Sequence, residues 1–279
     1  MVSSRPACQT GFLLKEDFSV RGILKLISGF ICPEKCVSCG EILDIKSDKP
    51  FCPRCAEKWE REKLRERDEC LGQPVAGFAD KPTERSGYVC YLVRYDPHEN
   101  TSAAFSLIWR LKSFATASVI DFAADELAGL ITSAASAALV GRDPEDIIVT
   151  NIPRRPKNVL NTGYDHMAEC ARAAASKLGF RYAPLLARTS AAREQKSLGR
   201  SERVRNAEET MFLKRKYRNK VADKIIILMD DIVTSGASLG AAASILLEAG
   251  AKMIISATLA ATKTAPLHEK ARRSRGERL

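Results

Sequence analysis

The sequence predicts an α/β protein, in which a parallel β-sheet is flanked by helices and a small cysteine-rich module precedes it. From residue 88 onward, short apolar runs typical of buried strands alternate with amphipathic stretches of helical period. Such alternation favours a parallel sheet covered on both faces. Before this region, four cysteines form two CxxC pairs with twelve residues between them: Cys36, Cys39, Cys52 and Cys55.

The individual elements follow from the spacing of the apolar residues. We expect strands over residues 88–94, 146–152, 224–230 and 252–260, and helices over 101–113, 118–139, 164–178 and 238–249. Apolar residues at helical spacing predict a short helix over 20–31, and a mixed-charge helix follows the cysteines. The loop-like stretch 75–87 indicates a boundary. The predicted organisation is a module over 20–75, an α/β domain over 88–262 and a basic tail over 263–279.

Composition and charge limit the classes of partner. The chain of 279 residues is 45% hydrophobic and 28% charged, as in an ordinary globular protein. It has no long apolar run and no basic start followed by an apolar core, so we expect a cytoplasmic protein without a membrane span. The net charge of +10 is concentrated: residues 186–220 hold eleven Lys and Arg against four Asp and Glu. This segment suits an anionic partner, whereas the basic tail is typical of a solvated chain end.

The two CxxC pairs predict a structural zinc site. Each pair forms a tight turn that directs two thiolates to one point, and two turns supply four tetrahedral ligands. Disulfides do not suit a cytoplasmic chain, and Cys32 is an alternative ligand one turn earlier. A zinc ion with four protein ligands has no open position, so this site organises the fold and does not catalyse. His166 and Cys170 lie at helical spacing, but no third group orients them, so we interpret both as structural.

The stretch IIILMDDIVTSGAS, residues 225–238, predicts a ligand site. Its apolar strand leads to Asp230 and Asp231, whose carboxylates suit the vicinal hydroxyls of a ribose. Next come small hydroxyl residues that open a helix, whose backbone N–H groups and dipole favour an anion: Thr234, Ser235, Gly236, Ala237 and Ser238. A ribose 5-phosphate satisfies both halves. The Walker pattern is absent, and a receiver domain would need more βα units than the 48 residues after Asp231 allow.

These residues resemble the phosphoribosyl-pyrophosphate (PRPP) signature of type I phosphoribosyltransferases: apolar residues, two acids, a spacer and T-[ST]-G-x-[ST]. The chain from about residue 20 to 262 is similar to the ComF family of competence-associated proteins, which join a zinc-ribbon region to a type I phosphoribosyltransferase domain. Two further motifs carry the resemblance. They are Gln195, Leu198, Arg200, Arg203 and Asn206, and upstream Pro153, Pro156, Lys157, Gly163 and Tyr164.

The chain departs from the family at two places. A second pair of CxxC turns is missing, and Cys70 alone remains near that position. Asp165 and His166 follow Gly163-Tyr164 where the family usually has Asn-Gln, which puts a negative charge near the region expected to meet pyrophosphate.

The resemblance implies transfer of a phosphoribosyl group from PRPP to a nitrogen nucleophile, with release of pyrophosphate and with Mg²⁺ bound to the PRPP. It implies that Asp230 and Asp231 bind the ribose and that residues 234–238 bind the 5-phosphate. Arg154 and Arg155 would meet the pyrophosphate, and the basic segment 188–206 would close as a lid, with Arg200 and Arg203 neutralising the departing charge. A non-catalytic PRPP or nucleotide sensor and a competence factor that handles single-stranded DNA remain alternatives. A competence-machinery protein and a homo-oligomeric partner also stay open.

Overall fold

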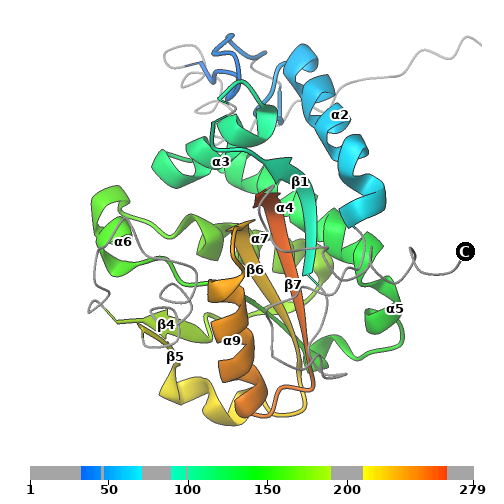
Figure 1. The fold of residues 1–279 in the computed structure, drawn as a ribbon, viewed down its shortest axis with the longest axis vertical. Coiled ribbons are helices and arrows are strands. Elements are labelled where there is room, and N and C mark those ends of the chain that lie inside the picture. The colour runs from blue at the N-terminus through cyan, green and yellow to red at the C-terminus, as the bar shows by residue number, and fades with distance from the viewer. Residues whose placement is uncertain (1–32, 45–46, 71–88, 99, 190–209, 263–279) are drawn as a thin grey trace, which may run out of the picture.

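The computed structural model describes residues 33–44, 47–70, 89–98, 100–189 and 210–262 (Figure 1). Several sequence predictions lie outside these residues. They are the helix over 20–31, the boundary over 75–87, the tail over 263–279, the alternative ligand Cys32 and the motif that holds Arg200 and Arg203.

A five-stranded parallel sheet forms the centre of the fold and confirms the predicted α/β class. The strands follow the order β1-β7-β6-β2-β3. Their bounds are β1 Val89–Tyr95, β2 Ile147–Asn151, β3 Arg181–Tyr182, β6 Ile225–Val233 and β7 Met253–Thr262. The apolar start of β6 is buried along its length, because helices or a hairpin cover both faces of the sheet.

Two apolar layers lie on opposite faces of the sheet. Ile225, Ile227 and Met229 belong to the layer under helices α3 (Ala103–Ser113), α4 (Ala117–Ala134) and α7 (His166–Leu178). Ile226 and Leu228 belong to the layer under helix α9 (Ala237–Glu248) and the antiparallel hairpin of β4 (Leu186–Arg188) and β5 (Met211–Leu213). Figure 1 shows α9 on one side of the sheet and α4 with α7 on the other. Successive strand residues thus serve different layers.

Some elements differ from the predictions. The expected helix over 118–139 is divided into α4 and the short α5 (Ser136–Leu139), and β6 extends three residues beyond the predicted end. Sequence periodicity missed the hairpin and the short helices η1 (Pro144–Asp146), α6 (Pro156–Thr162) and η2 (Arg215–Lys220). Such elements are too brief to show a repeat. Among the described helices, none combines the length and apolarity needed to cross a bilayer.

The cysteine module shares its core with the α/β domain. Helix α2 (Pro53–Cys70) carries Trp59, which is 1% exposed and makes edge contacts with Phe122 of α4. The Trp59 indole N–H donates to Glu126 Oε1 at 2.9 Å. The carboxylate of Glu62, also on α2, accepts from the backbone N–H groups at the start of α3, at 2.9 and 3.0 Å. Helix α2 therefore packs against α4 and, through Glu62, also caps the N-terminus of α3.

Candidate functional site

The acid pair lies on a part of β6 that has a neighbouring strand on one side. Pairing with β2 ends at Asn151 and Met229, whereas pairing with β7 continues to Val233. Asp230 and Asp231 are therefore inside a strand but beyond the end of β2. The carboxyl end of a central parallel strand is where such sheets bind ligands. The sequence placed the acids correctly at this end, although it predicted a loop where the strand continues.

Asp231 is held by two basic side chains from the helical layer. His166 Nε2, at the start of α7, lies 2.7 Å from Asp231 Oδ2, and Lys112 Nζ, near the end of α3, lies 3.2 Å from Oδ1. Burial would raise the pKa of Asp231, but the His166 hydrogen bond and the Lys112 charge outweigh burial and lower it. Asp231 is thus a fixed carboxylate.

Asp230 faces a different environment. Its Oδ1 accepts the backbone N–H of Asp231 at 2.9 Å, and the nearby Arg188 lies at the end of β4. Burial and the charge of Asp231 raise the pKa of Asp230 to about 8, although Lys112 and Arg188 oppose the rise. The two adjacent acids therefore differ strongly in their readiness to ionise in the free protein.

The segment Thr234–Ser238 forms the turn from β6 into α9. Gly236 has φ of 76° and occupies the N-cap of α9, a left-handed conformation that glycine adopts without strain. Gly236 has no side chain to cap this helix end, and Ser235 Oγ accepts the Ala237 N–H at a long 3.5 Å, so side chains among the described residues engage the first turn of α9 only weakly. Ser238 Oγ accepts from the Arg188 guanidinium at 3.0 Å. Backbone donors, hydroxyls and an arginine therefore gather where an anion would be stabilised.

Burial lowers the pKa of Arg188, and Asp230 raises it while Arg155 lowers it. Arg155 precedes α6 and lies close enough to act on Arg188 electrostatically. Arg188 thus connects the acid pair, the hydroxyl loop and the segment after β2. The sequence places Arg188 only in the basic segment 188–206, because nothing in its local sequence indicates that Arg188 contacts Ser238 of α9.

Arg154 is engaged by the protein itself. Its guanidinium donates to Thr162 Oγ1 at 3.0 Å, to the Tyr164 carbonyl at 3.3 Å and to the Lys112 carbonyl at 2.8 Å. Tyr164 Oη donates to the Leu111 carbonyl at 2.6 Å. These contacts satisfy the free carbonyls at the end of α3 and so fix the backbone that carries Lys112.

Asp165, the departure from the family motif, is the N-cap of α7. Its Oδ1 accepts from the N–H groups of Met167 and Ala168, and its Oδ2 accepts from Arg154 N at 3.1 Å. The carboxylate is thus used within the protein, close to a helix N-terminus that stabilises negative charge. Cys170 is fully buried and burial raises its pKa to about 12, as expected for a structural thiol.

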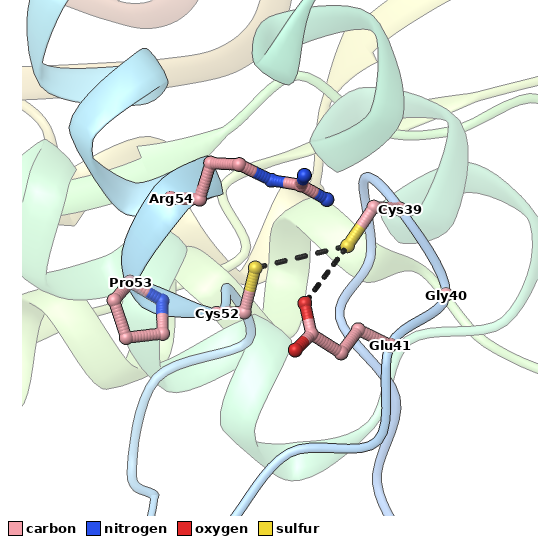
Figure 2. Close-up of a pocket in the computed structure, with 6 residues that line it drawn as sticks. All are labelled: Cys39, Gly40, Glu41, Cys52, Pro53 and Arg54. Carbon is pink, nitrogen blue, oxygen red and sulfur yellow. Dashed lines mark hydrogen bonds between the residues drawn. The ribbon is translucent and has the colours of Figure 1, made fainter.

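The four cysteines of the CxxC pairs converge on one point. All four Sγ atoms of Cys36, Cys39, Cys52 and Cys55 lie within 4.8 Å of one another. Cys39 and Cys52 Sγ are 3.7 Å apart (Figure 2). Tetrahedral zinc with Zn–S bonds of about 2.3 Å separates sulfurs by about 3.8 Å, whereas a disulfide would bring them to about 2.05 Å. The geometry fits zinc and excludes a disulfide between these two sulfurs.

The pKa values of the cysteines show what binding of a metal would have to overcome. Burial raises the pKa of Cys52 to about 12 and raises that of Cys55. Burial opposes ionisation of Cys36 as well, but hydrogen bonds from the backbone of Cys39, Cys52 and Ser38 outweigh it and lower the pKa to about 7. Four neighbouring thiolates are therefore unfavourable without a metal. Cys39 alone is exposed, and Glu41 Oε2 lies 3.8 Å from its sulfur (Figure 2).

This geometry is that of an α/β domain with a five-stranded parallel sheet and a four-cysteine cluster beside it. Residues 169–277 match the family model described as the phosphoribosyl transferase domain. The chain therefore carries a phosphoribosyltransferase-type domain, and its matched part contains both acids, the hydroxyl loop and Arg188. No curated protein matches the chain.

Solved structures give remote similarities. A glutamine phosphoribosylpyrophosphate amidotransferase from B. subtilis, complexed with ADP and GMP, is 16% identical with a TM-score of 0.35. The match covers 54% of this chain and 30% of that one, so it spans less than a third of the amidotransferase. An HGPRT-ase from Leishmania tarentolae in complex with GMP is 15% identical with a TM-score of 0.30, over 53% and 70% of the two chains.

Proposed function

We propose that the protein binds PRPP together with Mg²⁺ and transfers its phosphoribosyl group to a nitrogen nucleophile. The observation that carries the proposal is the continuous run from the acid pair on the part of β6 beyond the end of β2, through the Thr234–Ser238 turn, into the start of α9. Ribose hydroxyls and a 5-phosphate need acceptors and donors in this order along one surface.

The phosphate end of the ligand would lie at the start of α9. The backbone N–H groups from Ser235 to Ser238 would donate to its oxygens, and the hydroxyl of Thr234 would add a further donor. Arg188, already hydrogen-bonded to Ser238, would place a positive charge beside the phosphate. The ribose hydroxyls would then donate to Asp230 and Asp231.

Catalysis would be mainly electrostatic. The bond between ribose C1 and the pyrophosphate oxygen breaks, and its electron pair leaves with pyrophosphate. A nitrogen of the acceptor then bonds to C1 and loses a proton to solvent. Mg²⁺ would supply charge stabilisation to the leaving group, and the positive charge of Arg155 would add to this stabilisation. We assign Arg200 and Arg203 the same role from the lid segment, and Arg154 would act by fixing the loop that carries Arg155.

Zinc would hold the cysteine module against the domain. Cys36, Cys39, Cys52 and Cys55 would bind it as thiolates and leave no open coordination position. Because Trp59, four residues beyond Cys55, belongs to the shared core, the metal would stabilise the packing behind the sheet.

The finer assignment to the ComF family, and with it a link to competence and DNA uptake, rests on the sequence resemblance. A nucleotide sensor without turnover would use the same PRPP site. A factor for single-stranded DNA would instead depend on the basic segments, and its affinity would fall steeply with salt.

Calorimetric titration of the zinc-loaded protein with PRPP, with and without Mg²⁺, tests the proposal, followed by a pyrophosphate-release assay over a panel of nitrogenous bases. We expect Mg²⁺-dependent binding and release with at least one base. Binding without release would favour the sensor, and absence of binding would contradict the proposed function. Salt-dependent binding of a single-stranded oligonucleotide without PRPP binding would favour the DNA factor.

A further inference from the structure

Lys112 and His166 come from separate helices and meet on the same carboxylate. Lys112 Nζ contacts Asp231 Oδ1 at 3.2 Å, and His166 Nε2 contacts Oδ2 at 2.7 Å. The sequence separates His166 from Asp231 by 65 residues, and Lys112 lies farther still. The charges of Lys112 and Asp231 both act on the pKa of Tyr95, at the end of β1. Elements from across the sheet therefore converge on Asp231.

The helix ends that carry these two residues are themselves fixed. The last carbonyls of α3 accept from Tyr164 and Arg154, which holds Lys112 in place. His166 is the first residue of α7 and follows the capping residue Asp165. Ion pairs on the surface usually contribute little, because two flexible side chains must be ordered to form them. Here the backbone that carries each partner is already fixed, which distinguishes these contacts from an incidental surface pair.

The contacts use only part of the acceptor capacity of Asp231. A carboxylate has about four lone-pair sites, and Lys112 and His166 occupy one on each oxygen. About two sites remain for donors from a ligand. Because both oxygens are already held, the ligand would meet a carboxylate in one orientation, and little freedom would be lost on binding.

The ring of His166 is suited to orienting and not to proton transfer. Its side chain is 4% exposed, and Nδ1 is buried with no hydrogen-bond partner among the described residues. A general base needs a nitrogen that can reach the nucleophile. Here Nε2 is engaged by Asp231 and Nδ1 is closed off, so His166 acts through Asp231.

We propose that Lys112 and His166 are positioning residues for the ribose site, which fix Asp231 as a preoriented acceptor for the ribose hydroxyls. This inference rests on the proposed function. Among the residues that the structure describes, Asp230 has no comparable pair of side-chain contacts, so the two acids play unequal parts: Asp231 is oriented in advance, and Asp230 adjusts when the ligand arrives.

Matched substitutions separate orientation from packing. In His166→Leu the donor to Asp231 is lost, whereas in His166→Gln an amide can still donate. We expect His166→Leu to weaken Mg-PRPP binding about tenfold or more, and His166→Gln to stay within about threefold of the wild type. Lys112→Met should weaken binding and Lys112→Arg should largely restore it. His98→Gln, at an exposed histidine, is the control and should leave the affinity unchanged.

Equal affinities for His166→Leu and His166→Gln would overturn the inference, whether both were weak or both normal. Urea unfolding of each variant shows whether the fold is intact. A measurement without PRPP separates the positioning role of His166 from the proposed PRPP-binding function. The chain has three histidines, so NMR can assign the ring nitrogens of His166 by their loss in His166→Gln. These signals should shift in Asp231→Asn. Unshifted signals would overturn the inference, whereas a shift with no PRPP binding by the wild type would contradict the proposed function alone.

Discussion

Replacing each acid of the pair by asparagine should change stability in opposite directions. Asp231 is 8% exposed and accepts from His166 at 2.7 Å, with Lys112 at 3.2 Å. Asparagine keeps the shape but removes the charge. Since a hydrogen bond to a charged group contributes about 1.5–3 kcal/mol, Asp231→Asn should lower the free energy of unfolding by about 1–3 kcal/mol at neutral pH. Lys112 is partly exposed and stays solvated, which keeps the loss moderate.

Asp230→Asn should stabilise the free protein. Burial and Asp231 raise the pKa of Asp230 from 3.8 to about 8, so ionising it opposes folding. Each unit of such a rise costs the ionised folded state about 1.4 kcal/mol. The wild type therefore loses stability as pH rises from about 4 toward 8, and asparagine removes this loss. We expect a gain of about 1–2 kcal/mol or more at pH 8–9 and little gain near pH 4.

Asp231 should show the reverse dependence on pH. Its pKa is lowered, so its contribution is present above the ordinary aspartate range and is lost as pH falls through the folded pKa. Urea unfolding of the zinc-loaded, PRPP-free protein at pH 4, 7 and 9 measures both effects. Equal changes in the free energy of unfolding for the two variants, or changes that do not depend on pH, would refute the assignment of a lowered pKa to Asp231 and a raised pKa to Asp230.

Three further predictions concern the rest of the chain. Cys55→Ser should remove stoichiometric zinc, measured by metal analysis, and retention of full zinc would contradict the four-cysteine site. Trp59→Ala should destabilise the protein by about 3–5 kcal/mol in urea, with Trp59→Phe much milder, because the shared core loses a buried ring. Asp165→Ala should cost about 1 kcal/mol through the lost cap of α7 and Asp165→Asn much less, so equal costs would refute the capping role.

The local chemistry of this chain could be predicted from its sequence. The CxxC spacing predicted the four-cysteine cluster, because two tight turns can place four sulfurs together without help from distant residues. The apolar run of β6 and the glycine of the following turn were also readable, since burial and a positive φ leave a local signature. The α/β class followed from the same periodicity.

Contacts between distant segments could not be predicted. Nothing near Lys112 indicates that it reaches Asp231, because that contact depends on where α3 ends against the sheet. The pyrophosphate contact of Arg154 stays a prediction, but nothing in the local sequence indicates that its guanidinium holds the end of α3 through the Lys112 carbonyl. Asp165 was expected as an unfavourable charge, and it caps a helix. In each case a tertiary hydrogen bond decides the role of the residue.

A crystal structure of the zinc-loaded protein with Mg-PRPP tests the central claim most directly. The account predicts that 5-phosphate oxygens lie about 3 Å from the backbone nitrogens of residues 235–238. It also predicts that the ribose hydroxyls contact Asp230 and Asp231, with Lys112 and His166 still on Asp231. A ligand bound elsewhere, or a 5-phosphate that makes no contact with the start of α9, would contradict it.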